Sequence, residues 1–185
     1  MLLRHVRRSH PRRELHLLTL DPGDPVLEVL PRFLSFHVLP RRRSGWTYGS
    51  IGAWEVTADT GHGYEFFLLA PRDDPQLARL ISMIAHYHAN PDDETFRLGH
   101  GHTIPIGEPF LGGSCDHFLL SKPYTIGPEF EVCHVSDELH VQFLWMLPIT
   151  KAERDFAGEH SLEELEQRFE AVGIEYLDPH RDSVV

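Results

Sequence analysis

The sequence predicts an α+β fold, in which a mostly antiparallel mixed sheet is covered by helices. Three observations lead to this prediction. Strand-like runs rich in aromatic residues come early in the chain, one long helical stripe follows them, and further strand-like runs precede two helices with capping residues. Strands and helices that are grouped along the chain, rather than alternating singly, are typical of the α+β class.

The first part of the chain contains short strand-like runs. Residues 14–20 alternate weakly, and residues 27–38 fit either an edge strand or a short helix before Pro31 followed by a strand. The runs WTYGSIGAWEV and GYEFFLLA, residues 46–56 and 63–70, are rich in aromatic side chains. Because the turn-forming segment TADTGH separates them, we expect an antiparallel hairpin.

The first predicted helix covers residues 71–89. Asp73 or Asp74 can cap it, and Pro75 suits its first turn. One stripe of this helix carries Leu77, Leu80, Ile81, Ile84 and His88. The helix ends where a proline follows Asn90, because the residue before a proline disfavours the helical conformation.

Three strand-like runs follow, over residues 96–106, 115–123 and 139–149. The last of them is apolar on both faces, which is typical of a strand at the centre of its sheet. Two helices then complete the chain, and each begins with a capping sequence, T-x-x-E or S-x-x-E. We expect these helices over residues 151–157 and 162–172, each ended by a glycine.

Charge is unevenly distributed along the chain. The formal net charge is −11, and residues 1–13 carry five arginines and no acidic residue. We predict that residues 1–13 form a disordered basic leader and that residues 14–185 form a single domain. That domain carries 12 basic and 28 acidic side chains, a balance of −16. Because this charge repels phosphates and attracts basic surfaces, we expect a basic protein as the partner and no nucleic acid.

Membrane association and disulfide formation are both unsupported by the sequence. No run approaches the roughly 18 apolar residues that a membrane span requires, so we expect no membrane partner. The two cysteines, Cys115 and Cys133, form neither a C-x-x-C motif nor a disulfide framework. This cysteine usage fits a reducing compartment, and we therefore predict a cytoplasmic protein.

The histidines raise the question of a metal site. His100 and His102 form an H-x-H pair, and on a strand both side chains share one face, with Cα atoms about 6–7 Å apart. A metal-dependent hydrolase that uses them with Asp116 or His117 is therefore one alternative. Neither H-E-x-x-H nor a cysteine pair supplies further ligands, so we expect no metal and no cofactor.

A second H-x-H pair, His86 and His88, lies in the predicted helix. Residues two apart on a helix point about 200° away from each other, so these two cannot bind the same ion. His88 also fits the apolar stripe, where a packed core histidine is the simpler interpretation.

No set of catalytic residues emerges from the remaining motifs. YGSIG resembles the G-x-S-x-G elbow, but Tyr48 replaces its first glycine, and residues 46–56 are predicted as continuous strand instead of a strand-to-helix turn. Ser114 to His117 are adjacent in the chain, and adjacent residues rarely face one another as a triad requires. The chain also lacks the glycine-rich phosphate-binding motifs. We therefore expect a protein that is not an enzyme.

Several segments together resemble the Suppressor of Fused domain family. The most specific are GWTYGSIGAWE, LGHGHT, LPITKAE and the final DPHRDSV, and the resemblance covers roughly residues 34–184. It implies an α+β domain without known catalytic activity. Animal members are two-domain cytoplasmic regulators that clamp a short peptide, partly by strand addition. Single-domain members are bacterial, and many are thought to be immunity proteins of polymorphic toxin systems.

The resemblance therefore implies a protein-binding module, and first of all a bacterial immunity protein that neutralises a toxin by direct binding. A peptide-binding regulatory scaffold is the alternative within the same class. By position, the partner-binding candidates are Tyr87, Gly101 and His102. The positions that the resemblance marks as structural are Trp46, Gly52 and Arg181.

Overall fold

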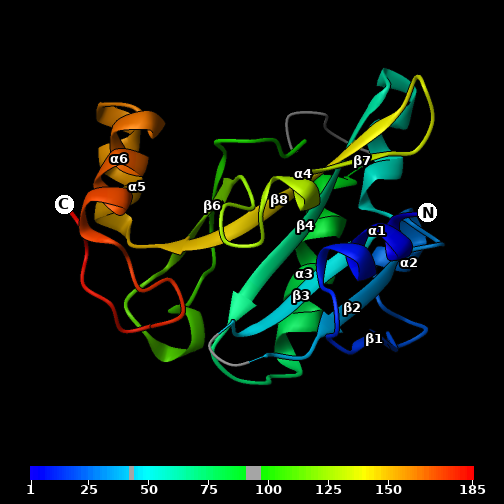
Figure 1. Ribbon diagram of the computed structural model, residues 1–185, viewed down its shortest axis with the longest axis horizontal. Coiled ribbons are helices and arrows are strands. Elements are labelled where there is room, and N and C mark those ends of the chain that lie inside the picture. The colour runs from blue at the N-terminus through cyan, green and yellow to red at the C-terminus, as the bar shows by residue number, and fades with distance from the viewer. Residues whose placement is uncertain (42–43, 91–96) are drawn as a thin grey trace. The chain divides into compact units, whose positions relative to one another are not determined.

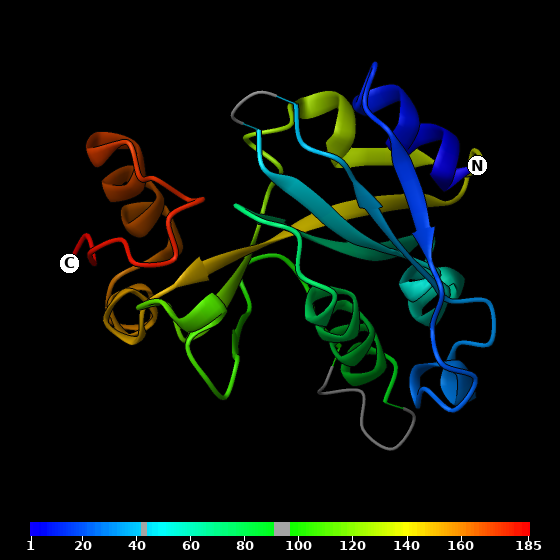
Figure 2. The same ribbon diagram turned by 90° about the horizontal axis from the view of Figure 1, so that it is seen from below.

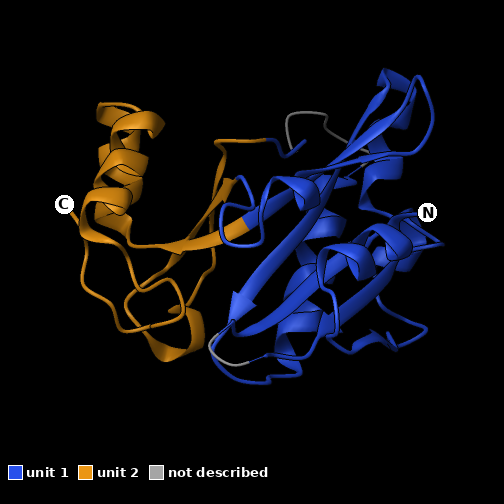
Figure 3. Cartoon of the chain, in the orientation of Figure 1, with its two compact units in different colours: residues 1–99, 122–145 blue, residues 100–121, 146–185 orange. Residues whose placement is uncertain are grey.

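The computed structural model describes residues 1–41, 44–90 and 97–185, and the chain forms two compact units (Figure 3). Unit 1 comprises residues 1–99 and 122–145, and unit 2 comprises residues 100–121 and 146–185. The strands belong to an eight-stranded sheet with the order β1-β2-β3-β4-β8-β6-β5, and β7 also pairs with β8. Among the strand pairs whose register is described, only β4 and β8 run parallel. The predicted α+β class with a mostly antiparallel mixed sheet is confirmed.

Unit 1 contains a meander of four antiparallel strands, followed by a parallel pairing of β4 with the first part of β8 (Figure 1). Its strands are β1 (Leu15–Leu18), β2 (Leu34–Val38), β3 (Trp46–Ile51), β4 (His62–Ala70), β7 (Val132–His134) and the start of β8 (His140–Ile149). Its helices are α1 (Leu2–Ser9), α2 (Val26–Val29), the 3-10 helix η1 (Ala53–Thr60), α3 (Gln76–His88) and α4 (Pro128–Glu131).

Helices cover both faces of the strands in unit 1 (Figure 2). Successive residues of β4 show the two faces, because neighbouring side chains of a strand point in opposite directions. The Phe66 ring lies 5.2 Å from that of His88 in α3, whereas the Phe67 ring lies 5.1 Å from that of Phe130 in α4. Strand β8 is buried on both faces along Phe143 to Ile149, as its apolar sequence predicts.

Residues 1–13 differ from the disordered leader that the sequence predicts, because they include helix α1. Leu2, His5 and Val6 are buried on one side of this helix, and the His5 ring stacks on Phe143 with 5.5 Å between centroids. At the end of the segment, the Arg13 guanidinium donates to the carbonyl oxygen of Leu39 at 2.7 Å. The few apolar residues of the segment share one helical face, and so they can be buried while the arginines remain at the surface.

The segment after β3 also differs from the prediction. The sequence predicts one strand over residues 46–56, but the strand ends at Ile51 and η1 begins at Ala53. Gly52 adopts a φ of 118°, and its N–H donates to the buried Glu65 carboxylate, as does the Ser50 hydroxyl. The Glu65 carboxylate on β4 accepts hydrogen bonds from backbone N–H groups after Ile51, so these groups do not continue the hydrogen bonding of strand β3. The predicted antiparallel hairpin of β3 and β4 is confirmed.

Two local predictions about the first half are refined. Residues 27–38 form a short helix and a strand, α2 and β2, which is the second of the two alternatives. Helix α3 begins later than predicted, at Gln76, because the Asp74 carboxylate accepts the Gln76 N–H at 3.0 Å and sets the first turn. The Tyr48 hydroxyl holds the preceding turn by donating to the Asp73 carboxylate.

Unit 2 combines short strands with two helices. Its elements are β5 (Thr103–Pro105), the 3-10 helix η3 (Phe110–Gly112), β6 (His117–Ser121), the end of β8, α5 (Lys151–Glu159) and α6 (Leu162–Val172). The predicted capping box of α5 is present, and the Ser161 hydroxyl accepts the Glu164 N–H at the start of α6. Gly173 ends α6 in the left-handed conformation, with φ 67°. Gly158 does not end α5, which continues to Glu159.

The C-terminal segment of unit 2 is anchored by a buried ion pair. The Arg181 guanidinium donates to both oxygens of the Glu153 carboxylate, at 2.6 and 2.7 Å. The same carboxylate accepts the N–H groups of Thr150 and Val184, at 2.8 and 3.1 Å. Glu153 therefore caps α5 and fastens the end of the chain at the same time.

Candidate functional site

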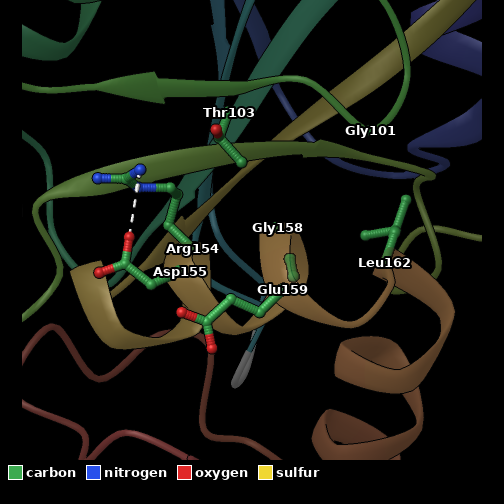
Figure 4. A pocket seen from close by; sticks show the side chains of 8 residues that line it. Gly101, Thr103, Arg154, Asp155, Gly158, Glu159 and Leu162 are labelled. Atoms are coloured by element: carbon green, nitrogen blue, oxygen red, sulfur yellow. Dashed lines mark ion pairs between the residues drawn. The ribbon is translucent and has the colours of Figure 1, made fainter.

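Unit 2 contains a hollow of about 390 Å³ beside strand β5 (Figure 4). Its walls come from the segment just before β5, the first residue of β5, the second half of α5 and the first residue of α6. The lining residues are Gly101, Thr103, Arg154, Asp155, Ala157, Gly158, Glu159 and Leu162. We call this feature the β5 hollow.

Small residues account for the open space. Gly101, Ala157 and Gly158 present little or no side chain to the β5 hollow. Gly101 has a φ of 84°, and a Cβ added there would lie 3.3 Å from a methyl carbon of Leu162. The glycine therefore allows both the left-handed backbone and the close approach of Leu162, which supplies the apolar part of the wall.

Three charged side chains line the β5 hollow. Arg154 and Asp155 pair with each other, with 3.2 Å between Nη1 and Oδ1, and the Lys151 ammonium lies 2.5 Å from the other Asp155 oxygen. The hydrogen bond from Lys151, assisted by the charge of Arg154, lowers the pKa of Asp155. Glu159 has no ion-pair partner among the described residues. The uncompensated charge of the hollow is therefore the Glu159 carboxylate.

Strand β5 is an edge strand. It pairs with β6 and is last in the strand order, so its other edge carries no strand in the described part of the chain. The Leu120 N–H donates to the His102 carbonyl at 2.9 Å, and the Ile106 N–H donates to the Asp116 carbonyl at 2.9 Å. Backbone groups of an antiparallel strand face alternate sides. Thr103 therefore directs its N–H and C=O toward the open edge, while its side chain lines the β5 hollow.

The predicted partner-binding residues are divided between the two units. Gly101 lines the β5 hollow, and His102 is exposed beside it, both in unit 2. Tyr87 is 41% exposed near the end of α3 and belongs to unit 1. Glu159 and Leu162 are lining residues that the sequence did not indicate, because nothing in it places α5 beside β5. Their only local signal is the spacing of Asp155 and Glu159, which puts two carboxylates on one helical face.

The positions that the resemblance marks as structural lie at constrained places. Trp46 begins β3, with its ring 5.2 Å from the His37 ring. A Cβ on Gly52 would lie 3.1 Å from the Phe33 Cα, and the residue also needs its positive φ. Arg181 makes the buried ion pair described above. Their structural role stays a prediction, with this geometry as its physical basis.

The histidine pairs are not assembled into a ligand set. His100 and His102 are both exposed, and no three potential ligands converge anywhere in residues 1–41, 44–90 and 97–185. The His117 ring lies 2.8 Å from the Asp116 carboxylate, its neighbour in sequence. His88 is buried, and its Nδ1 accepts the Leu98 N–H at 2.8 Å. The alternative of a metal-dependent hydrolase gains no support from this arrangement.

Two of the candidate nucleophiles, Ser50 and Cys115, are buried, whereas Ser114 is exposed and donates its hydroxyl hydrogen to the Arg181 carbonyl at 2.6 Å. The chain does turn from a strand into a helix after Ile51, as a nucleophile elbow requires. Ser50 is nevertheless fully buried and donates its hydroxyl hydrogen to Glu65. Cys115 and Cys133 are both buried free thiols. Burial raises the pKa of Cys115 to about 11, which keeps the unreactive thiol form.

The length and polarity of the helices bear on the membrane question. Within the residues that the structure describes, no helix combines the length and the apolar character needed to cross a bilayer.

Comparisons with known proteins identify the family. The family model described as Suppressor of fused protein (SUFU) matches residues 32–182. Among solved structures, the SUFU homolog from Neisseria gonorrhoeae FA 1090 is 35% identical, with a TM-score of 0.81 over 100% of this chain and 94% of that one. A search of curated proteins found no match.

Two more distant structures share the fold. The Sufu-Fu complex is 14% identical, with a TM-score of 0.70 over 99% of this chain and 90% of that chain. Drosophila Suppressor of Fused is 13% identical, with a TM-score of 0.57 over 93% of this chain and 42% of that chain. The family match begins at residue 32, so it does not test the predicted domain start at residue 14. The match over most of the chain and the 35% identity to the Neisseria protein show that this chain belongs to the Suppressor of fused protein family.

Proposed function

We propose that this chain is a non-enzymatic module that binds an extended segment of a partner protein through unit 2. The observation that carries the proposal is the open edge of β5 beside the β5 hollow. An extended peptide can add to such an edge through backbone hydrogen bonds, while a pocket takes one of its side chains. The fold is shared with a solved Sufu-Fu complex, in which a protein of this fold is crystallised with a partner.

The charge of unit 2 supports a basic partner. Its residues, 100–121 and 146–185, include 12 acidic and 4 basic side chains, a formal balance of −8. Unit 2 therefore holds most of the net charge of −11. Such a surface accelerates encounter with a basic partner and disfavours an acidic one.

Within this class we propose a bacterial immunity protein, which neutralises a toxin by direct binding. The similarity to a bacterial homolog along nearly its whole length, together with the acidic unit 2, supports this proposal. A regulatory scaffold that binds a peptide of a non-toxic protein is the second candidate, and it has the same edge strand in its favour.

Co-expression with the proteins encoded beside its gene tests the immunity role. We expect one neighbour to be toxic alone, to co-purify with this chain and to be harmless in its presence. Binding without protection would favour the regulatory scaffold, whereas no binding and no protection for any neighbour would contradict the immunity proposal.

The binding mode has its own test at Thr103. Thr103→Pro removes an N–H that faces the open edge and leaves the hydrogen bonds to β6 in place. Losing one or two backbone hydrogen bonds to the partner is expected to weaken binding about tenfold. Thr103→Val keeps the N–H and is the matched control. Equal binding by both variants, measured by calorimetry, would exclude strand addition at β5.

A further inference from the structure

We infer that the β5 hollow accepts a long basic side chain, arginine or lysine, of the partner segment, and that Glu159 is its counter-charge. This inference deepens the proposed function and rests on it, because the proposed function is what assigns the basic side chain to a protein partner.

The position of Thr103 links the strand edge to the hollow. Its backbone faces the open edge, and its side chain lines the β5 hollow. Side chains of a strand added at this edge alternate between the two faces of the sheet. Every second side chain of the segment therefore lies on the Thr103 face, and one of them can enter the hollow.

The walls of the β5 hollow fit a side chain that is apolar along its stem and charged at its end. Leu162 offers apolar surface, and Gly101, Ala157 and Gly158 leave the space open. Glu159 and the Thr103 hydroxyl can accept hydrogen bonds from a charged head group. Lysine and arginine combine a chain of methylene groups with a cationic head and suit such a lining.

The charges of the β5 hollow select a cation. Arg154 points toward Asp155, so these two side chains largely compensate each other (Figure 4). Lys151 pairs with Asp155 as well, at 2.5 Å. Glu159 remains as the carboxylate free to pair, and the acidic surroundings in unit 2 strengthen its preference for a cation.

A small-molecule probe tests the charge recognition without a known partner. We propose to titrate the full ¹⁵N-labelled chain with N-acetyl-arginine amide and to follow the amide signals of Gly101 and Gly158. N-acetyl-citrulline amide is the matched control, because it has nearly the same shape without the charge. The lysine analogue shows whether the hollow distinguishes a guanidinium from an ammonium group.

Two variants assign the effect to Glu159. Glu159→Gln is expected to weaken the arginine probe about fivefold, because a charge-assisted hydrogen bond becomes a neutral one. Glu170→Gln, at an exposed carboxylate of α6 that does not line the β5 hollow, is expected to change the affinity less than about twofold. Equal losses in both variants would contradict the assignment to Glu159.

A third variant fills the hollow. A Cβ at Gly158 meets no atom within 4 Å, and replacing a helical glycine raises helix propensity, so Gly158→Leu should fold normally. It is expected to abolish the shift that the arginine probe causes at the amide of Gly101, the reporter that remains in this variant. Ala171→Leu, on the exposed part of α6, is the matched control and should leave this shift unchanged.

The outcomes separate the inference from the proposed function. Equal shifts with the arginine and citrulline probes, or shifts unaffected by Gly158→Leu, would overturn the basic pocket and leave the Thr103 test of strand addition intact. Selective arginine binding together with unchanged partner binding by Thr103→Pro would support the pocket and contradict strand addition.

Discussion

Two residues far apart in sequence, Glu153 and Arg181, hold the C-terminal part of unit 2 together. Their side chains are 0% and 6% exposed, and the guanidinium meets the carboxylate with two short hydrogen bonds. A buried pair of this kind contributes little compared with a well-packed apolar pair, but the loss of one partner leaves a buried charge uncompensated.

We therefore expect Arg181→Ala to lower the free energy of unfolding by about 3–5 kcal/mol. Glu153→Gln should cost a similar amount, because it leaves the guanidinium without its counter-charge. The double variant Glu153→Leu/Arg181→Met should lose clearly less than the two single losses combined. Urea titrations of all three measure this, and strictly additive losses would contradict the coupling.

Glu65 is a buried carboxyl group that organises the turn between β3 and η1. It is fully buried, and burial raises its pKa to about 7, while the hydrogen bonds from Ser50 and from the backbone of Gly52, Ala53 and Trp54 oppose that rise. Since the pKa in the folded state exceeds the ordinary glutamate value of 4.5, the folded state binds this proton more tightly.

The contribution of Glu65 to stability is thus complete below pH 4.5 and is lost as the pH rises through about 7. The loss can reach about 3 kcal/mol, as the size of the pKa shift implies. We expect the difference in unfolding free energy between the wild type and Glu65→Gln to decline from pH 4.5 to 7.5. A difference that is constant over this range, measured in urea, would contradict the raised pKa.

At the level of the elements, helix α1 is the clearest departure from expectation. The basic composition of residues 1–13 suggested disorder, but Leu2, His5 and Val6 lie on one face and are buried. A helix needs only such a stripe to pack, and the arginines on its other face remain in solvent.

Deletion of residues 1–9 is expected to lower the free energy of unfolding by about 2–4 kcal/mol, because two aliphatic side chains lose their burial. Replacing Arg4, Arg7 and Arg8 by serine tests the basic face and should change stability by less than about 1 kcal/mol. Thermal and urea unfolding measure the stability of the deletion variant and of the serine variant. A deletion without effect would show that α1 does not contribute to the core.

At the scale of the whole molecule, the two units differ in charge. Unit 2 has a formal balance of −8 within a net charge of −11, so most of the excess negative charge lies in the unit that carries the proposed binding surface. Charge that lies outside the direct contacts with a partner chiefly affects the rate at which the two proteins associate.

For a basic partner, raising the salt concentration from 50 to 500 mM should lower the association rate about tenfold, with little change in the dissociation rate. Stopped-flow measurements would check this. Glu163→Lys/Glu164→Lys in unit 2 should reproduce the slower association, whereas Glu28→Lys/Glu129→Lys in unit 1 should do so much less.

Most elements could be predicted from local patterns, but their ends often could not. The stripe of α3 and the capping box at Thr150 and Glu153 are local signals, and the structure contains both elements. The strand after Trp46 was predicted too long, because Glu65 on another strand binds the backbone that follows Ile51. An end that depends on a distant side chain has no local signal.

The candidate site was predictable only in part. The resemblance to the Suppressor of Fused domain family indicates Gly101 and His102 by their position, and Gly101 does line the β5 hollow. Glu159 and Leu162 were not indicated, because α5 and β5 are almost fifty residues apart in sequence.

The sequence by itself determined the fold class, the order of the longer strands and helices from β3 onward and the acidic charge, because periodicity, caps and composition act over short ranges. Only the tertiary structure decided that α1 is packed, that His100 and His102 lack further described ligands, and that Glu159 stands beside an open strand edge. These contacts form between residues that are distant in sequence. The free energy of burial and pairing decides which of them form, and no local sequence signal reports it.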